Sequence, residues 1–167
     1  VPAAWIVRHP NHLEVRYMVR AGLTIGRTNG REAFVDEALH YLTCSISSMR
    51  RGMAGDAAFG LFLPHHAIAR FVLRGGLPIQ GAPEDFIRQL DAEARNLSRQ
   101  AASILDAQAK GALDAGSCAG WAIPDMSGKG LWLGRSTHSH VPGHGAVPTA
   151  LLRTYLGWHQ IPVEKEA

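Results

Sequence analysis

The first regular pattern along the chain is an alternation of apolar and polar residues over positions 13–19. One side of this stretch carries Leu13, Val15, Tyr17 and Val19. A period of two residues is typical of a strand that is buried on one face, so we predict a strand here. Ala21-Gly22 then offers a turn into residues 23–25, and the sequence therefore predicts a short N-terminal β-hairpin.

A helical period replaces the alternation beyond Asn29. Glu32 follows Asn29 at the spacing of a capping box, and Arg50, Arg51 and Gly52 are residue types typical of the end of a helix. The apolar positions between these two signals are Val35, Ala38, Leu39, Leu42, Ile46 and Met49. We therefore expect a helix of about five turns in this part of the chain.

Residues 56–76 fit two patterns. Ile68, Phe71 and Val72 are spaced for a helix, whereas alternate residues from 67 to 73 are apolar as in a strand. Proline is tolerated at the first position of a helix, as Pro64 would be, and Gly75-Gly76 makes a natural stop. The sequence favours a helix here, with a strand as the alternative.

The most regular segment begins at Pro83, Glu84 and Asp85, which are typical of a helix start. One apolar stripe then continues as far as Gly111. Its members are Phe86, Ile87, Leu90, Ala94, Leu97, Ala101, Ile104 and Leu105. The stripe predicts a long central helix that forms the spine of the core.

The composition changes after Gly111. Eight of the 18 glycines lie between Gly111 and Gly145, which predicts a loop region over about 111–146. Beyond it, a final helix is expected from Val147 to about Trp158, with Leu151, Leu152 and Tyr155 buried.

Together these elements predict a single α+β domain over residues 1–167 that is rich in helix. Its expected parts are a short N-terminal β-hairpin, a long central helix and a Gly-rich C-terminal loop region. Hydrophobic residues make up 46% of the chain and charged residues 19%, which suits one well-filled core. No apolar run is long enough to span a membrane, and Cys44 and Cys118 are too sparse for a disulfide scaffold. We therefore expect a soluble, intracellular protein of the cytoplasm.

Three histidines, His138, His140 and His144, lie within seven residues. On a strand, His138 and His140 would point the same way, and a turn at Pro142-Gly143 would return His144 to meet them. Three neutral imidazoles arranged in this way would bind zinc and leave one position open for water. The sequence thus carries a candidate zinc site, and the alternative is a histidine-containing loop without a metal.

Cys118 lies among small residues that would leave its sulfur accessible. A cysteine nucleophile needs a nearby base, which His138 or His140 would supply if the loop folds back. This arrangement would be typical of a hydrolase. The alternative is a small buried thiol with no chemical role.

Arginines mark a possible phosphate-binding surface. Arg88, Arg95 and Arg99 fall on one side of the predicted long helix, away from its apolar stripe, while Arg50 and Arg51 would close the preceding helix. The formal net charge is only +3, which permits nucleic-acid binding without requiring it. The alternative is a solvated face with ordinary ion pairs.

Each catalytic arrangement in the sequence lacks a member that its chemistry requires. The sequence therefore favours a non-catalytic binding or adaptor domain whose partner is a protein or a nucleic acid. One alternative is a small hydrolase that uses Cys118 with a histidine of the 138–144 loop. The other is a zinc-dependent enzyme or a zinc-stabilised fold. Zinc is the one cofactor that the sequence indicates.

Overall fold

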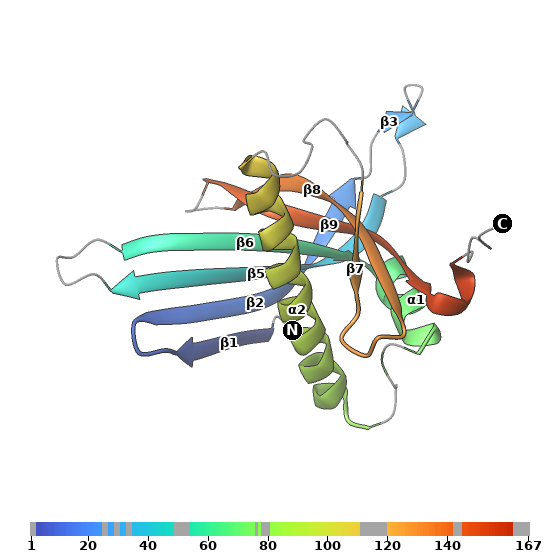
Figure 1. Ribbon diagram of the computed structural model, residues 1–167, viewed down its shortest axis with the longest axis horizontal. Helices are drawn as coiled ribbons and strands as arrows, with labels where there is room; N and C mark the ends of the chain where they lie inside the picture. The colour runs from blue at the N-terminus through green and yellow to red at the C-terminus, as the bar shows by residue number, and fades with distance from the viewer. Residues whose placement is uncertain are drawn as a thin grey trace.

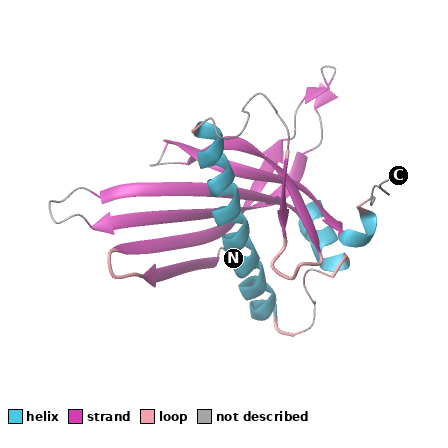
Figure 2. Ribbon diagram, in the orientation of Figure 1, coloured by secondary structure: helices cyan, strands magenta, loops and turns pink. Residues whose placement is uncertain are grey.

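The computed structural model describes residues 3–24, 27–28, 31–32, 35–48, 54–75, 77, 81–110, 120–141 and 145–161. Most of the described chain forms one seven-stranded mixed sheet, and the long helix α2 crosses one face of it (Figures 1 and 2). The prediction of a helix-rich fold was therefore wrong, because strands outnumber helices among the described elements.

The sheet consists of two antiparallel parts. In chain order its strands are β1 (Ala3–Arg8), β2 (His12–Thr24), β5 (Val35–Ser48), β6 (Ala54–Pro64), β7 (Trp121–Pro124), β8 (Gly130–Val141) and β9 (Gly145–Gly157). Across the sheet the order is β1-β2-β5-β6-β9-β8-β7. Neighbouring strands are antiparallel except β6 and β9, which pair in parallel. A separate ribbon pairs β3 (Arg27–Thr28) with β4 (Arg31–Glu32).

Two helices lie between β6 and β7 in the chain, so the connection from β6 to its parallel neighbour β9 contains α1, α2, β7 and β8. The first, α1 (His65–Leu73), follows Pro64 directly and ends before Gly75, whose φ of 97° favours glycine. The second, α2 (Pro83–Ala109), has proline at its start and Glu84 and Asp85 in its first turn, where acidic groups suit the helix dipole. The predicted long central helix is thus confirmed. A short 3₁₀ turn, η1 (Trp158–Gln160), follows β9.

The helix expected between Asn29 and Gly52 was wrong, because most of that stretch is strand β5. Tyr41 and Leu42 are neighbours on opposite faces of this strand, and both are fully buried. A strand that is buried on both faces carries apolar residues almost continuously, and such a run also matches helical spacing by chance. Arg50 and Arg51 lie outside the described residues.

The prediction of a final helix over Val147–Trp158 was wrong for the same reason, because this segment is a strand that is buried on both faces. Strand β9 lies between β6 and β8, and it buries Leu151 and Leu152 on opposite faces. The predicted loop region was wrong as well, because β7 and β8 occupy much of 111–146. One of its glycines has a packing role: a Cβ atom on Gly134 would lie 2.2 Å from the Trp121 ring.

The N-terminal hairpin exists, but its turn lies elsewhere. The strand predicted over 13–19 is confirmed within β2, and β2 continues through Ala21-Gly22 without turning. The turn instead joins β1 to β2, where the backbone N–H of His9 donates to the carbonyl oxygen of His12 at 2.9 Å.

The main core lies between the helices and the sheet. It contains three aromatic rings in mutual contact, those of Phe71 of α1, Trp132 of β8 and Tyr155 of β9, with ring centroids 4.7 to 5.3 Å apart. From α2 it receives Leu90, Ala94, Leu97 and Ala101, all buried members of the predicted stripe. Among the described residues, no helix is long and apolar enough to cross a membrane.

Candidate functional site: an apolar groove between the two helices

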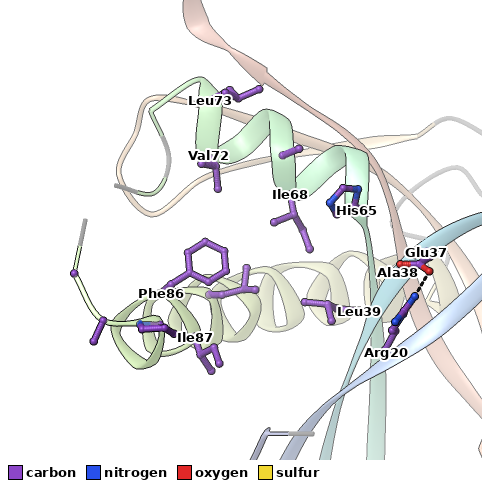
Figure 3. Close-up of a pocket in the computed structure, with 15 residues that line it drawn as sticks. Arg20, Glu37, Ala38, Leu39, His65, Ile68, Val72, Leu73, Phe86 and Ile87 are labelled. Atoms are coloured by element: carbon purple, nitrogen blue, oxygen red, sulfur yellow. Dashed lines mark hydrogen bonds and ion pairs between the residues drawn. The ribbon is translucent and has the colours of Figure 1, made fainter. Parts of the chain in front are cut away.

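A cavity of about 880 Å³ opens between α1 and the first turns of α2, where β5 contributes Ala38 and Leu39 (Figure 3). We call it the interhelical groove. Its large apolar lining residues on the helices are Ile68, Val72, Leu73, Phe86, Ile87 and Leu90. The groove is thus a concave apolar surface with few polar groups, which is the usual character of a binding site.

Helical spacing explains why α1 can line both the core and the groove. Ala67 and Phe71 are four residues apart and are buried in the core. Ile68 and Val72 are shifted by one residue, so they form an adjacent stripe that points into the groove (Figure 3). The helix therefore presents two apolar stripes, and the main core uses only one of them fully.

Apolar surface continues onto the rim of the groove. The side chain of Leu73, at the end of α1, is 82% exposed, and Ile87 on α2 is 38% exposed. Large apolar side chains at the edge of an apolar cavity mark an interaction surface more specifically than scattered exposed residues do.

The few charged groups of the groove gather at one end. Arg20 of β2 forms an ion pair with Glu37 of β5, and His65 lies nearby at the start of α1 (Figure 3). Both members of the pair are mostly exposed, so the ion pair adds at most about 1 kcal/mol to stability. A ligand can displace this pair at little cost.

Behind the groove, α2 is attached to the sheet by a buried ionic cluster. The Asp91 carboxylate accepts two hydrogen bonds from Arg16, each at 3.2 Å, and a third from the Tyr41 hydroxyl at 2.8 Å. Arg95 Nε lies 3.4 Å from the same carboxylate but makes no hydrogen bond. Burial alone would lower the pKa of Arg16, but its bonds to Glu14 and Asp91 outweigh burial and raise that pKa. The cluster therefore places an ion pair between Arg16 and Asp91 beneath α2.

A second buried carboxylate attaches α2 to the β7–β8 turn. Glu93 accepts a hydrogen bond from Trp132 Nε1 at 3.0 Å and another from the backbone N–H of Met126 at 3.1 Å. Burial raises the pKa of the Glu93 carboxyl, and the nearby Asp125 adds to that effect. Both oxygens are occupied by donors of the fold, so this carboxylate has a structural role.

His40 is a half-buried titratable group on the face of the sheet away from α2. Its ring stacks on Phe62 with centroids 4.3 Å apart, and its Nε2 atom has no hydrogen-bond partner. Gly60 leaves room for it, because a Cβ atom there would lie 3.1 Å from Nε2. Burial lowers the pKa of His40, since the charged form would lose its hydration.

The lowered pKa of His40 predicts a loss of stability in acid. The unfolded chain takes up a proton more readily, so this histidine's contribution is present above about pH 6.5 and is lost as the pH falls toward the folded-state pKa. His40→Phe keeps the stacking without a titratable group, and we expect a smaller drop in the free energy of unfolding between pH 7.5 and 5.5. Urea titrations at both pH values measure this difference. His138→Gln is the control, because His138 is exposed. If His138→Gln reduced the drop in the free energy of unfolding between pH 7.5 and 5.5 as much as His40→Phe does, the prediction would be contradicted.

The predicted catalytic and zinc-binding residues are only partly described. His138 and His140 lie two residues apart on β8, opposite Pro148 and Ala146, and both are exposed. Cys118 and His144 lie outside the described residues. The structure therefore places two of the three histidines on a common strand, and both the zinc site and the cysteine hydrolase stay predictions.

The predicted arginine surface divides into separate parts. Arg88 pairs with Asp85 at 3.2 Å on the exposed side of α2, whereas Arg95 lies against the buried Asp91. Arg99 is exposed on the same helix.

The sequence alone does not reveal the groove. Its residues on α2 belong to the stripe that predicts a core helix, and the spacing of Ile68 and Val72 predicts only that their segment is helical. One feature of the sequence could have indicated the groove. Each helix carries more apolar residues than its contact with the main core buries, so its apolar face is wider than that contact needs. Comparison of the chain with models of protein families, with curated proteins and with solved structures found no match.

Proposed function

We propose that this chain is a non-catalytic binding domain that holds a protein partner by accepting apolar side chains of that partner into the interhelical groove. The observation that carries the proposal is the apolar lining, which extends from the interior of the groove onto the exposed Leu73 and Ile87. Amphipathic helices bind to proteins in this way, with apolar residues at helical spacing inserted into a groove.

The rim favours a protein over a small molecule. A volume of about 880 Å³ lies within the range of roughly 300–1,000 Å³ that small ligands occupy. A small molecule inside the groove would nevertheless cover Leu73, which is 82% exposed, only in part, whereas a protein surface would cover it more fully. Arg20 and Glu37 present both signs of charge at one end, which suits the polar flank of an amphipathic helix.

Nucleic acid is the less well supported partner. Two of the three helix arginines already contact carboxylates, Arg88 that of Asp85 and Arg95 that of Asp91, so a phosphate would compete with groups of the fold. Binding to a nucleic acid depends on several cationic side chains that contact phosphates, and Arg99 alone would supply only one such contact.

The groove is tested with the fluorescent probe anilinonaphthalene sulfonate, whose emission rises in apolar surroundings. Leu73→Gln and Ile87→Gln should each weaken binding of the probe by about tenfold, because each places an amide where the apolar rim contacts it. Ile6→Gln is the matched control, since Ile6 is 69% exposed on β1 and does not line the groove. Equal affinities in all variants would overturn the groove as a binding site.

The class of partner is tested by photo-crosslinking in cells. A benzoyl-phenylalanine at position 73 should yield one discrete protein adduct, which Ile87→Gln abolishes and which the same group at position 6 does not form. Probe binding without any such adduct would assign the groove to a small molecule. Salt-dependent oligonucleotide binding that is lost in Arg99→Gln would instead support a nucleic-acid partner.

A further inference from the structure

The turn between β1 and β2 brings together three metal-ligating side chains. His9, His12 and Glu14 each offer one ligand atom, and these atoms all lie within 4.8 Å of one another. The two imidazole rings are stacked, with centroids 4.2 Å apart and planes inclined by 9°. This is the one such group of three histidine, cysteine or acidic residues in the part of the chain that the structure describes.

The backbone holds this arrangement in place. Only Pro10 and Asn11 separate the two histidines, and the hydrogen bond from the His9 N–H to the His12 carbonyl closes the turn. Glu14 lies two residues beyond His12 on β2, and alternation along a strand places these two side chains on the same face. The three ligands are therefore brought together by the hairpin itself.

One pair of ligand atoms already has the spacing that a transition metal requires. His9 Nε2 lies 3.3 Å from Glu14 Oε2. Two ligands that bind one tetrahedral zinc ion at about 2.0–2.1 Å are separated by about 3.3 Å, so this pair already has the spacing of zinc ligands. The imidazole rings of His9 and His12 are stacked, and a metal ion lies in the plane of each ring that binds it, so binding of one ion requires the His12 ring to turn out of the stack.

The carboxylate is oriented by a partner from the core. Arg16 Nη1 donates to Glu14 Oε1 at 2.6 Å, which leaves Oε2 directed toward His9. Arg16 is itself held by the buried Asp91 carboxylate beneath α2. Such outer partners fix the orientation of metal ligands and strengthen binding.

We propose that His9, His12 and Glu14 form a binding site for a divalent transition metal ion, of which zinc best fits two imidazoles and one carboxylate. The ligand set leaves at least one coordination position for water, because His9 is exposed and the other two side chains are only partly buried. The site lies on the β1–β2 turn and does not involve residues of the interhelical groove. It is therefore independent of the proposed protein binding.

The experiment uses the full chain without a polyhistidine tag, freed of metal by a chelator and then titrated with zinc against a chromophoric indicator. We expect one zinc ion per chain. His9→Gln and His12→Gln should each weaken binding at least tenfold, whereas His138→Gln and His140→Gln should leave it unchanged. Cobalt added in place of zinc should give the visible absorption of a bound, low-symmetry ion, and His12→Gln should remove it.

The two groups of histidine variants separate the possible outcomes. Binding that is lost in His138→Gln or His140→Gln but kept in His9→Gln would assign the metal to the histidines of β8 and overturn the proposal. Binding of zinc only at millimolar concentration, or with no difference among the variants, would also overturn it. All four substitutions are at turn or strand positions outside the main core, so loss of folding does not confuse the result.

Discussion

Replacing Asp91 by alanine is expected to lower the free energy of unfolding by about 3–5 kcal/mol. The change removes one member of a buried ion pair and leaves the Arg16 guanidinium, whose side chain is 6% exposed, with Glu14 as its remaining carboxylate partner. It also removes the acceptor of the Tyr41 hydroxyl. Chemical denaturation followed by circular dichroism measures the loss.

Asp106→Ala is the matched control on the same helix. Asp106 pairs with Lys110 at 2.6 Å, but both side chains are more than 60% exposed, so its removal should cost less than about 1 kcal/mol. A double variant, Arg16→Met with Asp91→Leu, should lose less than the sum of the two single changes, because it leaves neither charge alone. Equal losses for Asp91→Ala and Asp106→Ala would show that the buried cluster does not hold α2 to the sheet.

Trp132→Ala is expected to cost a similar amount, about 3–5 kcal/mol. The indole is fully buried between Phe71 and Tyr155, so its removal leaves a large cavity in the main core. It also deprives the buried Glu93 carboxylate of a donor. The loss should be measured by denaturation at neutral pH.

Trp158→Ala is the control, because it removes a tryptophan that is partly exposed and so tests whether the loss of stability depends on burial. Trp158 is 47% exposed and its Nε1 donates to the carbonyl oxygen of Gly128 at 2.6 Å, so we expect a smaller loss of stability. Trp132→Phe should recover part of the cavity cost but not the hydrogen bond to Glu93. A Trp132→Ala variant as stable as Trp158→Ala would contradict the position assigned to this side chain.

The long helix and the first long strand could be predicted from the sequence. For α2 the start signal at Pro83 and an apolar stripe were enough. The alternation over residues 13–19 predicts strand β2 correctly, but the buried residues of this strand are Arg16 and Met18, which lie on the face opposite the apolar residues of the alternation. Strands β5 and β9 are covered on both faces, so their patterns lose the period of two and resemble helices. Their identity depends on neighbouring strands that are distant in the sequence.

The same limit applies to the sites. Ile68 and Val72 are ordinary helix residues until the position of α2 shows that a groove separates them from Phe86. His9 and His12 were visible in the sequence, but the hairpin turn was predicted at Ala21-Gly22, which left the two histidines without a common location. Correct placement of one turn would have brought them together with Glu14.

The short parallel contact between β6 and β9 has a consequence for the order of folding. It pairs Gly60, Leu61 and Phe62 with Thr149, Ala150 and Leu151. On either side of this seam the sheet is antiparallel, and each half is built from strands that are neighbours in sequence. Closing a long loop costs more entropy than closing a hairpin, so the two halves have the lower barriers to formation. We therefore expect the seam to form after the two halves, and α2 to reach its position across both of them only at that step.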